Sequence, residues 1–227
     1  MSLEILHQSF WSRSALGKAI ELHSCLRPSQ RPILFIGGVH GDEPEGVKLA
    51  EQFLIWLQKN NKSDFHSWIL IPCLNPDGFH NQDRVNGRGV DLNRNFPSPD
   101  WTSKIKAPRY NPGPHPASEP EVQSLCRLVE SSQPQVIIHF HSWKACVVYT
   151  GITGKTWAEK IAGNSGYSVR EDIGYPTPGS LGQYAWLKFK IPVVCVEEEE
   201  KSDLEKIWPR FAKGLEKVLT RDQGSSQ

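Results

Sequence analysis

Long apolar runs are missing from this sequence. None of its 227 residues belongs to a stretch long and apolar enough to cross a membrane, and the N-terminal segment MSLEILHQSFWSRSALGKAIELHS lacks the uninterrupted apolar core of a signal peptide. The formal net charge of +1 is also too small to attract nucleic acid or an anionic membrane. We therefore expect a cytoplasmic protein that is not exported and that binds neither nucleic acid nor membranes.

The cysteines show no pairing pattern. Their number, five, is odd, and no two of them form a CxxC pair. They are Cys25, Cys73, Cys126, Cys146 and Cys195. They stand in mainly apolar segments, where a free thiol behaves as a small packing residue. This usage favours reduced side chains in the cytoplasm over a disulfide framework or a zinc ribbon.

The overall composition is that of an ordinary globular protein, with 38% hydrophobic and 22% charged residues. A chain of 227 residues suffices for one large α/β domain, which would bury roughly 70–75% of the surface of the unfolded chain. We expect a single domain over residues 1–220, followed by a disordered tail at residues 221–227.

Strand-like and helix-like segments alternate along the chain. Strands are expected at residues 33–39, 68–74, 136–142, 147–150, 168–172 and 193–197, with a hairpin or edge strand between Ser12 and Cys25. Helices are expected at residues 44–60, from Ser118 onward, and at 157–162, 181–189 and 204–219. This alternation predicts a three-layer α/β/α domain around a central mixed, mostly parallel sheet.

Two segments depart from the simple alternation of strands and helices. Residues 97–120 contain seven of the seventeen prolines and show no helical or strand period, so we expect a long ordered loop or the rim of a site. The strand at 147–150 follows the strand at 136–142 so closely that we expect the two to pair.

A His and an acid follow the first core strand. The segment ILFIGGVHGDE, residues 33–43, reads as a buried strand, a glycine turn, and then His40 and Glu43. Imidazole and carboxylate both suit Zn²⁺, but catalytic zinc normally takes a third protein ligand. An isolated HxxE motif is more often a polar turn at the start of a helix. This segment alone supplies only two of the three expected protein ligands, so it does not by itself establish a metal site.

Polar side chains also follow three other expected strands. They are the NPDG turn at residues 75–78, the pair His141 and Ser142, and Glu197. Ligands of open α/β sheets gather at the carboxyl ends of strands, so these residues and HGDE are expected at one edge. That agreement favours a functional site over a set of unrelated turns.

The segment NPDGFHNQDRVNGRGVDLNRNFP, residues 75–97, would by itself read as an irregular surface loop with a basic face. Taken with HGDE upstream and His141–Ser142 downstream, it resembles the zinc carboxypeptidase family of the carboxypeptidase A type. The matching motifs are SALGKAI, HGDE, NPDG, GVDLNRNFP, HS and VVCVE, and they span most of the chain.

The resemblance implies that His40, Glu43 and His141 bind one zinc ion per chain, which would acidify water and polarise a carbonyl group. His139 is a rival third ligand, because HFH places both histidines on one strand face. A Ser next to the ligand in the family pattern favours His141, which leaves His139 as a packing or supporting residue. Asp42 is then a turn residue or a supporting acid.

The resemblance also implies that Glu197 is the general base, which passes a proton from water to the leaving amine. The acidic run at residues 197–200 leaves Glu199 as an alternative, since it shares a strand face with Glu197. Glu197 is favoured because it is the first acid after the apolar strand.

Further residues match the substrate-binding groups of the family. Arg84 aligns with the arginine that stabilises the oxyanion, and Asn93 with Arg94 matches the pair that binds a terminal carboxylate. Arg88 has no counterpart. Tyr175, in IGYPTPGSLG, is the candidate for the mobile active-site tyrosine.

The chain most resembles the murein tripeptide amidase branch of the family, in its compact length, the loop around Tyr175 and the SEPE helix start. Enzymes of this branch cleave the bond between γ-D-glutamate and diaminopimelate during cytoplasmic recycling of cell-wall peptides. The expected substrate is therefore a small peptide with a free C-terminal carboxylate. Alternatives are a general metallocarboxypeptidase, an N-acyl amino acid deacylase of the succinylglutamate desuccinylase or aspartoacylase kind, and a zinc-free peptide-binding relative. The sequence leaves the side-chain preference and the oligomeric state open.

Overall fold

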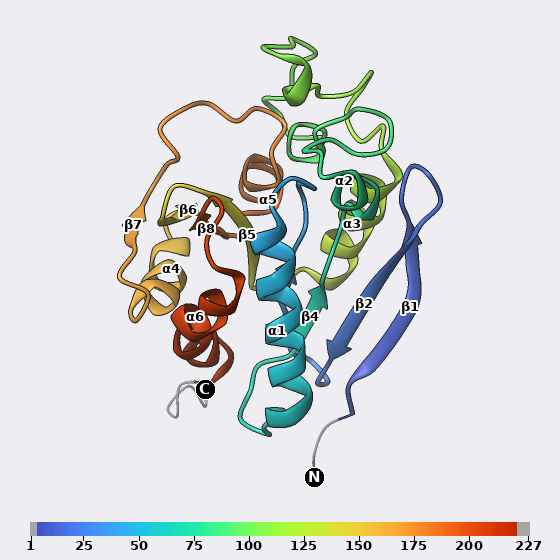
Figure 1. Cartoon of the computed structure of the whole chain (residues 1–227). Helices are drawn as coiled ribbons and strands as arrows, with labels where there is room; N and C mark the ends of the chain where they lie inside the picture. Colours follow the sequence, from blue (N-terminus) through green and yellow to red (C-terminus); the bar gives the residue numbers. More distant parts are fainter. Residues whose placement is uncertain (1–3, 222–227) are drawn as a thin grey trace.

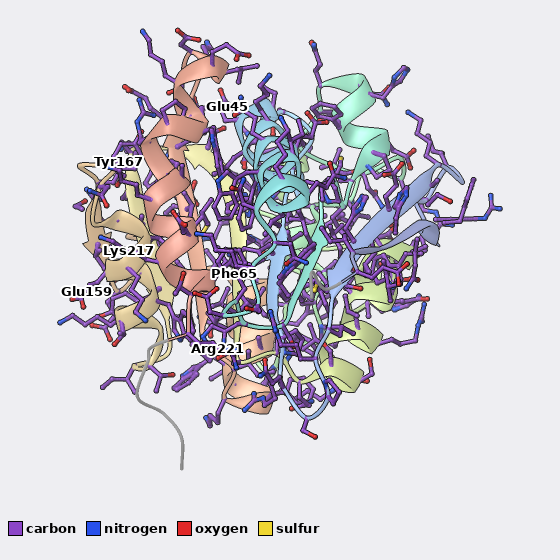
Figure 2. The ribbon with its side chains drawn as sticks, turned by 90° about the horizontal axis from the view of Figure 1, so that it is seen from below. Glu45, Phe65, Glu159, Tyr167, Lys217 and Arg221 are labelled. Carbon is purple, nitrogen blue, oxygen red and sulfur yellow. The ribbon has the colours of Figure 1, made fainter. Side chains whose placement is uncertain are left out.

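The computed structural model describes residues 4–221. Of the tail expected at residues 221–227, only Arg221 is among them. Its backbone N–H donates to the carbonyl oxygen of Asp64 at 3.0 Å, and its side chain donates to the Ser63 carbonyl. The chain after the last helix therefore meets the segment that leads into a central strand, where Phe65 pairs with Thr220; Arg221 and Phe65 are labelled in Figure 2.

The described residues form one sheet of eight strands in the order β1-β2-β4-β3-β5-β8-β6-β7 (Figure 1). The strands are β1 (Leu6–Arg13), β2 (Ala19–Cys25), β3 (Ile33–Ile36), β4 (Trp68–Ile71), β5 (Val136–Trp143), β6 (Cys146–Thr150), β7 (Ser168–Arg170) and β8 (Val193–Glu199). The four inner strands β4, β3, β5 and β8 are parallel, as are β6 and β7, whereas β1 with β2, β2 with β4, and β6 with β8 are antiparallel. The expected mixed, mostly parallel sheet is confirmed.

Helices cover both faces of this sheet. They are α1 (Pro44–Asn60), α2 (Pro76–Asn81), α3 (Pro120–Ser132), α4 (Gly154–Ala162), α5 (Leu181–Phe189) and α6 (Leu204–Leu219), with short 3₁₀ turns at Leu92–Arg94 and Pro108–Tyr110. Helices α1, α4 and α6 contribute to one core cluster, and α3 with α5 contributes to the other. The arrangement is the expected three-layer α/β/α sandwich.

The inner strands are apolar because both of their faces are buried. All four residues of β3 and of β4 are buried, as expected for parallel strands between two helix layers. Phe35 points to the α1 side, where its ring meets Phe53 edge-on at 4.9 Å, whereas Leu34 belongs to the opposite cluster with Val122. The sheet is therefore a rigid platform for residues at its strand ends.

Two sequence-based expectations were wrong. The segment at 147–150 does not pair with β5, because β8 lies between them and β6 pairs with β8. The strand β8 is buried on both faces, at Val193, Val194 and Val196. An inner position in the sheet, between two layers of helices, buries these side chains. The NPDG turn is the start of helix α2, where Asn75 accepts a hydrogen bond from the Gly78 N–H at 2.9 Å.

No helix within residues 4–221 has both the length and the apolar character needed to cross a membrane. The described cysteines are all free.

Candidate active site

Two glycines fix the turn that carries His40 and Glu43. A Cβ atom on Gly41 would lie 1.9 Å from the Gly78 carbonyl carbon in α2, and one on Gly46 would lie 2.3 Å from the Phe140 carbonyl oxygen in β5. Both contacts leave no room for a side chain. The start of α1 is therefore packed tightly between α2 and β5, and the HGDE turn faces the end of β5.

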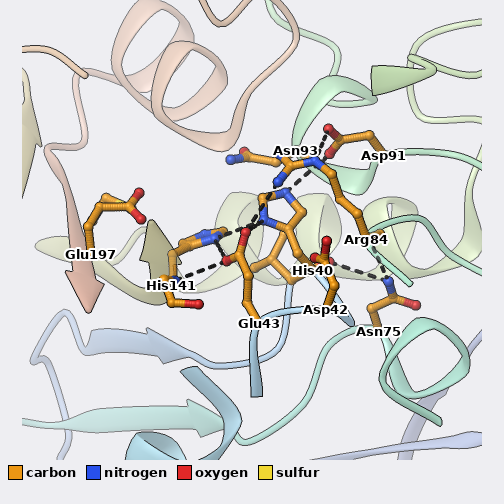
Figure 3. Close-up of polar contacts among 12 residues, drawn as sticks. His40, Asp42, Glu43, Asn75, Arg84, Asp91, Asn93, His141 and Glu197 are labelled. Atoms are coloured by element: carbon orange, nitrogen blue, oxygen red, sulfur yellow. Dashed lines mark hydrogen bonds and ion pairs between the residues drawn. The ribbon is translucent and has the colours of Figure 1, made fainter. Parts of the chain in front are cut away.

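The structure brings together the three residues expected to bind zinc (Figure 3). Glu43 Oε1 lies 2.7 Å from His40 Nδ1, and Glu43 Oε2 lies 2.7 Å from His141 Nδ1. The two Nδ1 atoms are 3.0 Å apart. Two imidazole nitrogens that face each other and one carboxylate form a donor set suited to zinc. We call His40, Glu43 and His141 the buried donor set.

Asp91 fixes the orientation of His40. Its Oδ1 lies 3.2 Å from His40 Nε2, and its Oδ2 accepts a hydrogen bond from Arg84 Nε at 2.9 Å. Because a carboxylate can only accept, Nε2 of His40 carries a proton toward Asp91, which would leave Nδ1 as the nitrogen that a metal in the donor set binds. Burial acts to raise the pKa of Asp91, but His40 and Arg84 hold that pKa well below its usual value.

Asp91 is not among the site residues predicted from the sequence. The one available indication was its position in GVDLNRNFP, where an acid directly follows an apolar residue and precedes another. Its Oδ1 also accepts the Asn93 N–H at 2.9 Å, so the same carboxylate shapes the segment that holds Asn93 and Arg94.

His139 lies behind His141. Its Nδ1 is 2.8 Å from His141 Nε2, on the side of the ring away from Glu43. Burial, followed by the neighbouring His141, holds the pKa of His139 well below its usual value, so it is a neutral imidazole. Donor atoms of His139, His141 and Cys195 also lie within 4.8 Å of one another, but neither His139 nor Cys195 lines the cavity described next.

A cavity of about 910 Å³ opens in front of the buried donor set. Arg84 stands on its wall, where Nη1 donates to Glu43 Oε1 at 3.2 Å. Asn93 accepts the Leu181 N–H through Oδ1 at 3.0 Å, which fixes its amide group. Arg94 donates to the Asn93 carbonyl at 2.7 Å. The cavity is thus lined by all of the expected ligand and substrate-binding residues: His40, Glu43, Arg84, Asn93, Arg94, His141, Tyr175 and Glu197.

Tyr110 is a cavity residue that the sequence reasoning missed. The guanidinium carbons of Arg84, Arg94 and Arg109 lie 5.2, 5.7 and 5.5 Å from its ring centroid. Such distances are typical of cation–π contacts. Arg109 also pairs with Asp42 at 3.1 Å, which places Asp42 at the rim rather than in the donor set. A tyrosine in an aperiodic, proline-rich loop carries no recognisable pattern.

Tyr175 lies on a loop that is anchored beside Arg94. Gly179 has a φ of +72°, and a Cβ atom there would lie 2.1 Å from the Arg94 carbonyl oxygen. The Tyr175 ring meets Trp143 edge-on at 5.8 Å and is 43% exposed. The loop is fixed at its base, while the tyrosine itself reaches the open side of the cavity.

Two acids of the run at residues 197–200 line the cavity, and of these Glu197 is buried whereas Glu200 is exposed. Glu197 lies beside His141 in the parallel register of β5 and β8 and is only 4% exposed. Burial raises its pKa, although His141 acts in the opposite direction. Glu199 is exposed and does not line the cavity, and Glu198 points to the other face, where it accepts a hydrogen bond from Ser202 at 2.9 Å.

This geometry agrees with comparisons to known proteins. A family model described as zinc carboxypeptidase matches residues 1–206. The chain belongs to the zinc carboxypeptidase family. As a member it is a peptide-bond hydrolase, and the buried donor set is where the family's zinc fits.

Similar proteins include murein peptide amidases and carboxypeptidases. The murein peptide amidase A of Escherichia coli K12 is 32% identical over 185 residues, which cover 77% of this chain and 74% of that protein. The murein-tripeptide amidase of Escherichia coli O157 has a similar crystal structure, with a TM-score of 0.77, 26% identity, and coverage of 96% of this chain and 93% of that chain. A carboxypeptidase A from Helicoverpa armigera shares the fold at 16% identity and a TM-score of 0.78, covering 96% of this chain and 68% of that chain.

Proposed function

We propose that this chain is a cytoplasmic zinc-dependent amidase that removes diaminopimelate from the γ-D-glutamyl group of murein tripeptide during cell-wall recycling. The observation that carries the proposal is the convergence of the buried donor set and Arg94 on one cavity. The similarity to murein peptide amidases supports the choice of substrate.

The buried donor set would hold the metal. When bound there, zinc supplies a Lewis acid that lowers the pKa of water and polarises a carbonyl oxygen. Asp91 keeps the Nδ1 lone pair of His40 available, and His139 supports the ring of His141 from behind. These contacts hold two of the three donors in position before any substrate arrives.

Glu197 acts as the general base in this proposal. Its carboxylate accepts the proton of the attacking water and donates it to the leaving amine. Its buried position beside His141 supports this role, because it shields the carboxylate from bulk water. The raised pKa brings the group closer to the range in which it can both accept and return a proton.

Cations on the opposite wall bind the charges of the substrate. Arg84 presents a permanent cation to the oxygen on which negative charge develops. Arg94, with the fixed amide of Asn93 beside it, can bind the terminal carboxylate through two parallel hydrogen bonds. Tyr175 also lines the cavity, and its role in this proposal is to cover the bound substrate.

A substrate panel tests this proposal. It contains murein tripeptide, an α-linked tripeptide with the same C-terminal residue, and N-succinylglutamate, each assayed with and without a chelator. We expect chelator-sensitive release of diaminopimelate from the murein tripeptide as the fastest reaction. A preference for the α-linked peptide would favour a general metallocarboxypeptidase, and a preference for N-succinylglutamate would favour a deacylase.

A further inference from the structure

A second group of metal-binding side chains lies far from the cavity, on the strands β1 and β2 at the edge of the sheet. His7 on β1 is directly opposite His23 on β2, and Glu21 precedes His23 by two positions on the same face of β2. Donor atoms of the three residues all lie within 4.8 Å of one another. We call His7, Glu21 and His23 the edge cluster, and none of them lines the cavity.

The ring nitrogens of the edge cluster converge on one carboxylate oxygen. Glu21 Oε2 lies 3.3 Å from His7 Nε2 and 3.6 Å from His23 Nε2. Two ligands held at zinc bond lengths in a tetrahedral arrangement lie roughly 3.3 Å apart. The observed separations are therefore close to those that a shared ion needs, and the two parallel rings must tilt toward each other for both Nε2 lone pairs to reach it.

The environment of His23 indicates that the edge cluster binds an ion. The residue is only 5% exposed, neither of its ring nitrogens makes a hydrogen bond among the described residues, and Nε2 approaches Glu21 Oε2 only to 3.6 Å. Buried polar atoms are almost always paired, so a buried imidazole without a partner requires an explanation. The rings of His7 and His23 are stacked at 4.2 Å and 5°, which places both Nε2 atoms at the edge that faces Glu21.

Access to this position is open. The side chains of His7 and Glu21 are 49% and 52% exposed, so an ion can reach the cluster from solvent while His23 supplies the inner ligand. Two neutral imidazoles and one carboxylate favour zinc and its neighbours in the first transition series over calcium or magnesium.

We propose that the edge cluster binds a divalent transition-metal ion of the zinc type, which ties the edge strand β1 to β2. Within residues 4–221, β1 pairs with β2 alone, and the register of the pair shifts between Gln8 and Ser12. An ion held by His7 from β1 and by two residues of β2 would cross-link the ribbon near its open end.

Isothermal titration of Zn²⁺ into the zinc-loaded full chain tests this site. We expect one additional equivalent in the wild type, and His7→Ala and Glu21→Gln should each bind it at least about tenfold more weakly. Both positions are exposed, so the variants should fold. His115→Ala removes another exposed histidine and should keep the additional equivalent.

Peptidase activity should be unchanged in these variants, because the edge cluster contributes nothing to the cavity. Hydrogen exchange supplies a second measurement: Zn²⁺ should slow amide exchange within Leu6–Arg13 in the wild type and in His115→Ala, but not in His7→Ala. The absence of an additional equivalent, or equal binding by wild type, His7→Ala and Glu21→Gln, would overturn the proposal.

Discussion

The buried donor set and the edge cluster contain the same residue types, two histidines and one glutamate, in very different surroundings. The buried donor set lies at the carboxyl ends of inner strands, where helices and loops enclose it. The edge cluster lies on an outer ribbon and is open to solvent on one side. Ligand chemistry alone therefore does not distinguish a catalytic centre from a peripheral site.

The two clusters differ in the groups that contact their histidines on the side away from the other ligands. In the buried donor set, Asp91 binds the far nitrogen of His40 and His139 contacts the far nitrogen of His141. In the edge cluster, the far nitrogen of His23, Nδ1, has no hydrogen-bond partner among the described residues. Groups that orient the ligands raise metal affinity and fix geometry, so we expect the buried donor set to bind zinc far more tightly.

The largest effect should follow removal of a ligand from the buried donor set. In His141→Ala, stoichiometric zinc binding at the cavity should be lost and peptide hydrolysis should fall to background, because two donors cannot hold the ion. Elemental analysis after dialysis and an assay with the murein tripeptide measure both quantities.

His139→Ala is the matched control for this change, because the two histidines share one strand face. It should retain zinc, with an affinity lower by roughly 10–100-fold, since it removes only the group behind His141. If His139→Ala lost the zinc and His141→Ala kept it, the two assignments would have to be exchanged.

The next largest effect concerns catalysis without loss of metal. Glu197→Gln keeps the shape of the side chain but removes its ability to accept a proton, so kcat/KM should fall by roughly 10²–10⁴-fold at unchanged zinc content. Glu199→Gln is the matched control on the same strand and should behave like the wild type. Equal losses in the two variants would contradict the assignment of Glu197 as the base.

The sequence predicted much of the fold because the local periodicity was strong. Helices α5 and α6 begin and end at the expected residues, and the three layers follow from alternating strands and helices. The neighbour of β6 could not be predicted in this way, since strand pairing depends on contacts between residues distant in sequence. Helix α2 was missed because its first residues, Pro76, Asp77 and Gly78, are also typical of turns.

The candidate site shows the same division. His40, Glu43 and His141 stand in short motifs at strand ends, so their types and positions were sufficient to indicate a metal centre. Asp91 and Tyr110 come from aperiodic loops, and their partners depend on how residues 83–111 fold over the cavity. Contacts of this kind leave no spacing in the sequence that could be recognised.

The smallest of these effects, and the one that tests the comparison most directly, should follow from Asp91→Asn. The amide keeps the size of the side chain and an oxygen for the Asn93 N–H, but it weakens the partner of His40 Nε2. Zinc affinity should fall by roughly 10–100-fold, measured by competition with a chelator of known affinity. Asp77→Asn changes an equally buried carboxylate that instead accepts the Leu16 N–H, and it should leave zinc affinity unchanged. Unchanged zinc affinity in Asp91→Asn would contradict the idea that groups behind the ligands make the buried donor set bind zinc more tightly than the edge cluster. Enclosure of the buried donor set between helices and loops would then be the cause of its tighter binding.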